Sequence, residues 1–106
     1  MQIAKLNEMH LGWFIGNFQP SVHKTKDFEA SVKYFKAGEE EKEHFQRVAW
    51  EVTVIVHGEA MIGSEICKAG DIITIEPLET AGFRAITDVS LVAIKFPSLP
   101  NDKVLA

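Results

Sequence analysis

The residues best suited to chemistry lie in one stretch of the chain, between Gly38 and Gly58. Five residues separate Gly38 from His44, Gln46 follows His44 by two positions, and six residues separate Glu51 from Gly58. An imidazole and a carboxylate can move protons on a substrate or bind a metal ion, whereas an amide is a weak, neutral ligand. Residues two apart on a strand share a face, so His44 and Gln46 are predicted to point the same way.

Short β-strands are the elements predicted to position these residues. Apolar residues that alternate or are β-branched mark segments 28–35, 48–56, 71–76 and 89–96, with turn residues at 57–59, 69–71 and 87–88. Turns spaced by roughly 10–15 residues are typical of a β-sandwich or barrel. No segment has the apolar face of an amphipathic helix. We interpret the acidic run 39–43 as a solvated loop, and residues 11–21 as a strand or arm across the sheet.

The spacing from Gly38 to Gly58 resembles the first motif of the cupin superfamily. That motif has a glycine, then His-x-His, then a glutamate and a second glycine, at intervals that this chain reproduces. The chain differs at one position, because Gln46 stands where the family has its second histidine. The resemblance implies a small single-domain, RmlC-like cupin, whose all-β fold is a small double-stranded β-helix, or jelly-roll barrel.

A second block, from Gly70 through a strand to Pro77, is similar to the family's second motif. Its histidine is absent, because that place falls on Ala81 or Gly82. On this resemblance the whole chain is one domain. Residues 1–27 would form an N-terminal arm and edge strands, 28–96 the barrel, and 97–106 an extended, irregular tail.

The resemblance implies a site for a divalent metal, with His44, Gln46 and Glu51 in the ligand positions. Two of the family's imidazoles are missing, so the metal is expected to be bound weakly or not at all. Glu79 could add a second carboxylate, which would suit Mn²⁺ or Mg²⁺. Without a metal, His44 is either a general base oriented by Glu51 or an imidazole hydrogen-bonded to Glu51 or Gln46 in a polar pocket.

Other polar residues are expected near the mouth of the barrel. Tyr34 and Arg84 lie on predicted strands, and Glu76 and Glu79 flank the turn at Pro77. An arginine among carboxylates can hold an anionic or sugar-like ligand by paired hydrogen bonds. The alternative is that Arg84 only pairs with Glu79 on the surface.

Charge and cysteine content exclude several classes of function. The chain has 11 basic and 15 acidic residues, a net charge of −4, which argues against nucleic-acid and acidic membrane partners. The single cysteine, Cys67, cannot form an intramolecular disulfide, and it is predicted to be a buried apolar residue rather than a nucleophile. With no signal-peptide pattern at its start, the chain is expected to be cytoplasmic.

Apolar residues occupy every even position from Val48 to Val56, including Trp50. If the odd positions line the barrel, this stripe points outward, and a second copy of the chain would cover it in a homodimer. The alternative cover is the N-terminal arm, through Trp13, Phe14 and Phe18.

Three functions remain open at this point. The first is binding of a small polar metabolite, sugar-like or a carboxylate, in the barrel with a weakened or absent metal site. The second is a cupin enzyme, either a metal-dependent oxygenase or isomerase, or a metal-free sugar isomerase or epimerase with His44 as base. The third is an interaction module that acts through its apolar face.

Overall fold

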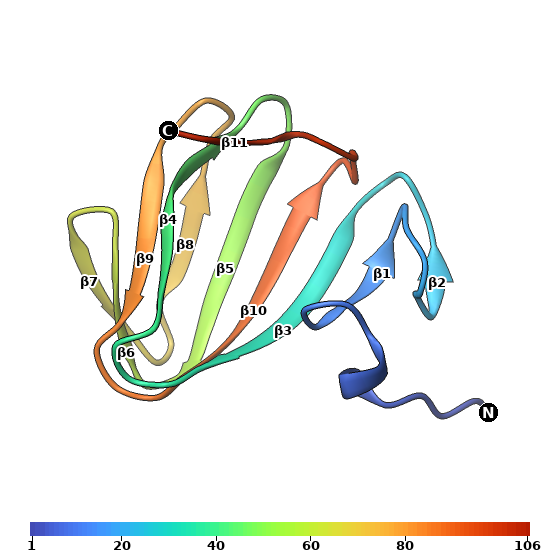
Figure 1. Cartoon of the computed structure of the whole chain (residues 1–106), viewed down its shortest axis with the longest axis horizontal. Helices are drawn as coiled ribbons and strands as arrows, with labels where there is room; N and C mark the ends of the chain where they lie inside the picture. Colours follow the sequence, from blue (N-terminus) through green and yellow to red (C-terminus); the bar gives the residue numbers. More distant parts are fainter.

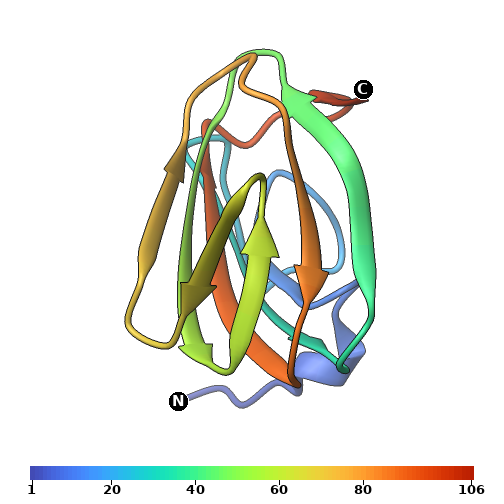
Figure 2. The same cartoon turned by 90° about the vertical axis from the view of Figure 1, so that its left-hand side faces the viewer.

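The protein is built almost entirely of β-strands, which form two facing sheets (Figures 1 and 2). A computed structural model describes residues 1–106. The strands are β1 (Trp13–Gly16), β2 (His23–Lys24), β3 (Glu29–Phe35), β4 (Glu40–Gln46), β5 (Trp50–His57), β6 (Glu59–Ile62), β7 (Glu65–Lys68), β8 (Ile72–Ile75), β9 (Ala81–Ala85), β10 (Val89–Phe96) and β11 (Lys103–Leu105). One 3₁₀ turn, Leu6–Glu8, precedes them. No helix has the length and apolar character needed to cross a membrane.

The six-stranded sheet has the order β2-β1-β3-β10-β5-β8, and the five-stranded sheet the order β11-β4-β9-β6-β7. The apolar core lies between the sheets where β5 and β10 face β6, β7 and β9. Its buried residues are Ile55, Ala60, Ile62, Cys67, Ala85, Val89, Leu91 and Ala93. Away from this core, polar and apolar side chains both lie between the sheets, and that end of the barrel contains the cavity described below.

Alternation along β5 places its odd positions inside, as the sequence predicts. Thr53 and Ile55 are buried, whereas Trp50 and Val56 on the opposite face are 39% and 59% exposed. The N-terminal arm does not cover this outer face. Its strand β1 pairs with β2 and β3 at the sheet edge, and Trp13 lines the space between the sheets instead.

Two segments expected to be irregular are strands. The acidic run belongs to β4, because a strand with one solvated face can carry glutamates there without burying them. The tail forms β11, which pairs with β4. It is held by the Asp102 carboxylate, which accepts hydrogen bonds from the backbone N–H groups of Val48 and Ala49.

The turn between β5 and β6 requires a glycine, as the motif spacing predicts. Gly58 has φ +89°, in the left-handed region, and a side chain there would collide with the carbonyl oxygen of Asp88. This turn lets the chain pass from the six-stranded to the five-stranded sheet.

Candidate functional site

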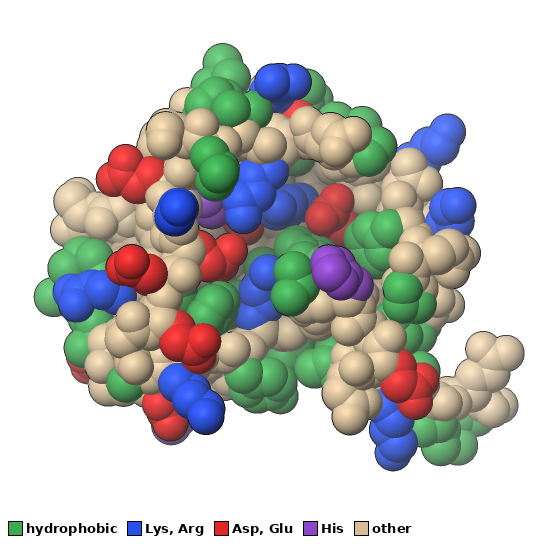
Figure 3. Space-filling view, in the orientation of Figure 1, with side chains coloured by type: hydrophobic (Ala, Val, Ile, Leu, Met, Phe, Trp, Pro, Cys, Tyr) green, Lys and Arg blue, Asp and Glu red, His purple; other side chains and the backbone are tan.

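A cavity of about 270 Å³ lies between the two sheets and opens on the face drawn in Figure 3, where lysine and glutamate side chains surround a hollow. Both sheets contribute charged or polar side chains to its wall. They are Lys33, Glu51, Thr53 and Lys95 from the six-stranded sheet, Glu41, His44, Gln46 and Lys103 from the five-stranded sheet, and Glu79 from the loop before β9. The volume suits a small molecule better than a drug-sized one.

A bulge in β4 brings Glu41 and His44 to the same cavity. The pairing of β4 with β9 shifts by one residue between Glu41, opposite Phe83, and His44, opposite Ala81. A bulge adds one residue to a strand, so positions three apart can share a face. Gln46, two residues beyond His44, then also faces the cavity.

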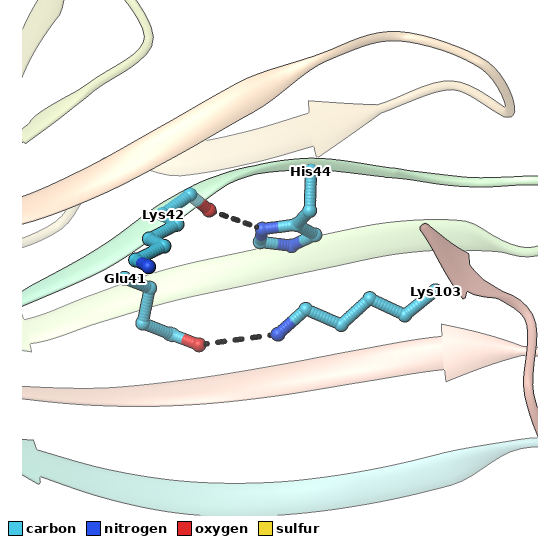
Figure 4. A network of polar contacts seen from close by, with 4 residues as sticks. All are labelled: Glu41, Lys42, His44 and Lys103. Atoms are coloured by element: carbon cyan, nitrogen blue, oxygen red, sulfur yellow. Dashed lines mark hydrogen bonds and ion pairs between the residues drawn. The ribbon is translucent and has the colours of Figure 1, made fainter. Parts of the chain in front are cut away.

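The imidazole of His44 is held by its own strand. Its Nδ1 lies 2.9 Å from the backbone oxygen of Lys42 (Figure 4). A carbonyl oxygen can only accept, so Nδ1 donates, and in the neutral ring Nε2 carries the lone pair. The partner of His44 is therefore neither Glu51 nor Gln46, the two residues considered from the sequence.

Gln46, which lines the cavity, has a side-chain polar group without a partner. The residue is 2% exposed, and its side-chain Nε2 has no hydrogen-bond partner. Its backbone oxygen accepts from the N–H of Leu78, which fixes the end of β4 against the loop before β9. A buried donor without an acceptor costs about 1–3 kcal/mol, so this amide is suited to bind an oxygen atom of a ligand.

Charges alternate across the six-stranded sheet beside Gln46. The strand register aligns Glu29 of β3 with Lys95 of β10, and Lys95 with Glu51 of β5. Burial raises the pKa of Glu29, while the hydroxyl of Ser98, which donates to its carboxylate, and nearby Lys95 act in the opposite direction. Opposite charges in adjacent strands let this polar row sit inside the barrel.

Trp13 lies between two lysines of the cavity. Trp13 of β1 lies opposite Ser31 of β3. Lys33 is two residues further along β3, and Lys95 of β10 lies opposite Glu29, two residues from Ser31 in the other direction. The Nζ atoms of Lys33 and Lys95 are 5.2 Å and 5.1 Å from the centre of the same ring. Ammonium groups at this distance are attracted to an indole.

Burial lowers the pKa of Lys33. Glu41 acts against this shift, and the positive charges of Lys95 and Lys103 add to it. Lys103 is itself paired with Glu41 at 3.7 Å (Figure 4). Lys33 was missed in the sequence because the apolar positions of segment 28–35 suggested the buried face, whereas Lys33, at a polar position, faces the cavity.

The other candidate binding residues divide between the cavity and the surface. Glu79 lines the cavity, and its carboxylate accepts from the N–H of Glu76. Tyr34 and Arg84 do not, contrary to expectation. Tyr34 is 72% exposed on the outer face of β3, and Arg84 is exposed on β9 opposite Glu40. Their strand positions have the outward parity, and Arg84 makes no ion pair with Glu79.

The donor set does not fit the divalent metal that the cupin resemblance implies. No three His, Cys, Asp or Glu side chains are grouped closely enough to hold an ion. Ala81, directly opposite His44, stands where an imidazole would be needed. Gly82 could not supply it, because a side chain there would point toward Glu43. His44, Gln46 and Glu51 therefore form a polar wall rather than a coordination site.

The remaining reactive residues lie away from the cavity. Cys67 is buried in the core as predicted, and burial raises the pKa of its thiol. A thiol that is protonated and buried is a poor nucleophile. His10, His23 and His57 are exposed.

Solved structures share this fold. An uncharacterized conserved protein with a double-stranded β-helix domain from Klebsiella pneumoniae is 22% identical, with TM-score 0.74 over 99% of this chain and 91% of that one. An RmlC-like cupin from Shewanella frigidimarina is 23% identical, with TM-score 0.66 over 70% and 69%. The DMSP lyase DddQ from Ruegeria pomeroyi is 19% identical, with TM-score 0.73 over 89% and 49%. No protein-family model matches the sequence, and no curated protein is similar to it.

Proposed function

Because this chain has the double-stranded β-helix fold of the cupins, we propose that it binds a small metabolite carrying a carboxylate in the cavity, without a metal. The amide of Gln46 carries the proposal, since its buried Nε2 lacks an acceptor at the cavity wall. A carboxylate oxygen would accept this hydrogen bond and remove the cost of the unsatisfied donor.

Two lysines lie beside Gln46, among the carboxylates of Glu29 and Asp102, and they supply the cations with which a ligand carboxylate would pair. Lys103 of β11 lies opposite Gln46 of β4. Both residues, together with Lys95, line a smaller recess of about 100 Å³ next to the main cavity. Lys103 is paired with Glu41. An incoming carboxylate would compete with Glu41 for this ammonium, so ligand binding is expected to loosen that pair.

Thermal unfolding with a panel of short carboxylates and sugars tests the proposal. A ligand present at one hundred times its Kd stabilises a protein by about 2.7 kcal/mol, which is readily measured as a rise in Tm. Gln46→Glu keeps the side-chain shape but replaces the donor with a negative charge, so it should abolish the rise with carboxylates. Arg84→Gln, outside the cavity, is the matched control and should retain it.

Two results would contradict the proposal. If no carboxylate raises Tm in the unchanged chain, the cavity does not bind this class. If sugars raise Tm and still do so in Gln46→Glu, the ligand is sugar-like and its hydroxyls, rather than a carboxylate, face residue 46.

Acid–base catalysis without a metal is the second candidate, and the hydrogen bond of His44 favours it. With Nδ1 donating to Lys42, Nε2 is free to take a proton inside the cavity. If a bound ligand is incubated with the protein in D₂O, His44 acting as base would exchange an acidic C–H of the ligand for deuterium, seen by proton NMR. Exchange should be lost in His44→Ala while binding persists; exchange that survives this change would exclude His44 as the base.

A further inference from the structure

Lys33 lines the cavity, shares the Trp13 ring with Lys95, and has its pKa lowered by burial. It reaches the cavity from β3, its Nζ is 5.2 Å from the ring centre of Trp13, and Lys95 approaches the same ring. An amine in a desolvated pocket next to another cation is the arrangement that activates lysine as a nucleophile.

We propose that Lys33 is a reactive amine that captures small aldehydes or ketones in the cavity as an imine. This step goes beyond reversible carboxylate binding, although it uses the same cavity. The Nζ lone pair attacks the carbonyl carbon, a C–N bond forms, and the carbonyl oxygen takes up the proton that nitrogen loses. The C–O bond then breaks as the hydroxyl takes up a second proton and leaves as water, and the nitrogen loses its remaining proton to give the imine.

The surroundings of Lys33 favour the neutral amine that this attack needs. Burial lowers its pKa, and Lys95 and Lys103 add to the shift. The carboxylates of Glu41 and Glu51 oppose it, Glu41 more strongly. When Lys33 loses its charge it gives up its attraction to Trp13, but the ring keeps a cation because Lys95 remains 5.1 Å away.

The same wall offers groups that can carry the protons. Glu41 is close enough to affect the pKa of Lys33, and as a carboxylate it can accept the proton that the ammonium releases. The Nε2 atom of His44, when protonated, can donate to the departing hydroxyl. Both groups come from β4, the strand facing Lys33 across the cavity.

Reductive trapping with pyruvate tests the proposal in the unchanged chain. Pyruvate with cyanoborohydride at neutral pH converts an imine into a stable amine adduct, which peptide mass mapping assigns to individual lysines. Lys33 should be modified faster than the exposed lysines Lys24 and Lys68, which act as internal standards. Equal or slower modification of Lys33 would overturn the proposal.

Two variants and one analogue keep the result interpretable. Lys33→Arg keeps a cation beside Trp13 but has no primary amine, so the fast adduct should disappear; its persistence at another cavity lysine would reject Lys33 as the nucleophile. Lys33→Met serves the same purpose if the arginine does not fold. Lactate has the carboxylate but no carbonyl. If lactate raises Tm but pyruvate gives no Lys33 adduct, carboxylate binding is supported and the imine is rejected. If pyruvate gives the Lys33 adduct but lactate does not raise Tm, the imine is supported and carboxylate binding is rejected.

Discussion

Replacement of Asp102 by alanine is expected to destabilise the whole barrel, because this one carboxylate attaches the last strand to the start of β5. Its two oxygens accept from the N–H of Val48 at 3.0 and 3.2 Å, and one of them accepts from the N–H of Ala49 at 2.9 Å. The residue is 8% exposed, so these are buried, charge-assisted hydrogen bonds.

The size of the effect follows from what happens to the two donors. A hydrogen bond to a charged group contributes about 1.5–3 kcal/mol. Val48 is 54% exposed, so water can replace the carboxylate there, whereas Ala49 is 2% exposed and its N–H would stay dry. For the N–H groups of Val48 and Ala49 together, we expect Asp102→Ala to lower the free energy of unfolding by about 2–4 kcal/mol. For a domain of this size that corresponds to a fall in Tm of about 10–20 °C.

Urea unfolding followed by circular dichroism measures this loss, with Asp102→Asn as the matched variant. Asparagine keeps one side-chain oxygen and can serve one of the two N–H groups, so it should lose about half as much stability. The denaturant slope should not change, because the fold is the same. An ordinary surface substitution changes stability by less than about 0.5 kcal/mol. A loss this small in Asp102→Ala would refute the stabilising role of the Asp102 hydrogen bonds.

Three further results are expected. Burial raises the pKa of Glu29, so just above pH 4.5 the folded state binds more protons than the unfolded state. The stability of the protein should therefore fall as pH rises through that window. Glu29→Gln should remove this fall and stabilise the protein at neutral pH, which a series of Tm measurements against pH would show. Two copies of the chain should associate through the outer face of β5, so light scattering should give about twice the chain mass. Val54→Lys should give a monomer that retains the fold. Gln46→His combined with Ala81→His should create metal binding that the unchanged chain lacks, visible as tetrahedral Co²⁺ absorption; its absence would show that residues 44, 46 and 81 do not converge.

The fold could be predicted because its strongest signals are local. Glycines at fixed intervals, such as Gly58, mark turns that no other residue fits, and β-branched residues mark β5 between them. The last strand could not be predicted, since it depends on the contact of Asp102 with backbone groups more than fifty positions earlier in the chain. Such distant pairing leaves no periodic trace in the sequence.

The candidate site was predictable only where the cupin spacing applies. It identified His44, Gln46 and Glu51, which do line one cavity. It could not identify Lys33 or Trp13, because strand alternation gives two faces but does not say which is buried. Here the polar face of β3 turns inward, and the reason is spatial: charges on the neighbouring strands and sheet are available to pair with it.

The position of Trp13 has a consequence for the motions of the protein. Its strand is short and joins the six-stranded sheet beside β3, near an edge, where backbone hydrogen bonds open most easily. Any molecule that rests against the indole is therefore expected to stabilise the pairing of β1 with β3. Amide hydrogen exchange at residues 13–16 should slow when the cavity is filled, so exchange in β1 would report whether the interior is occupied.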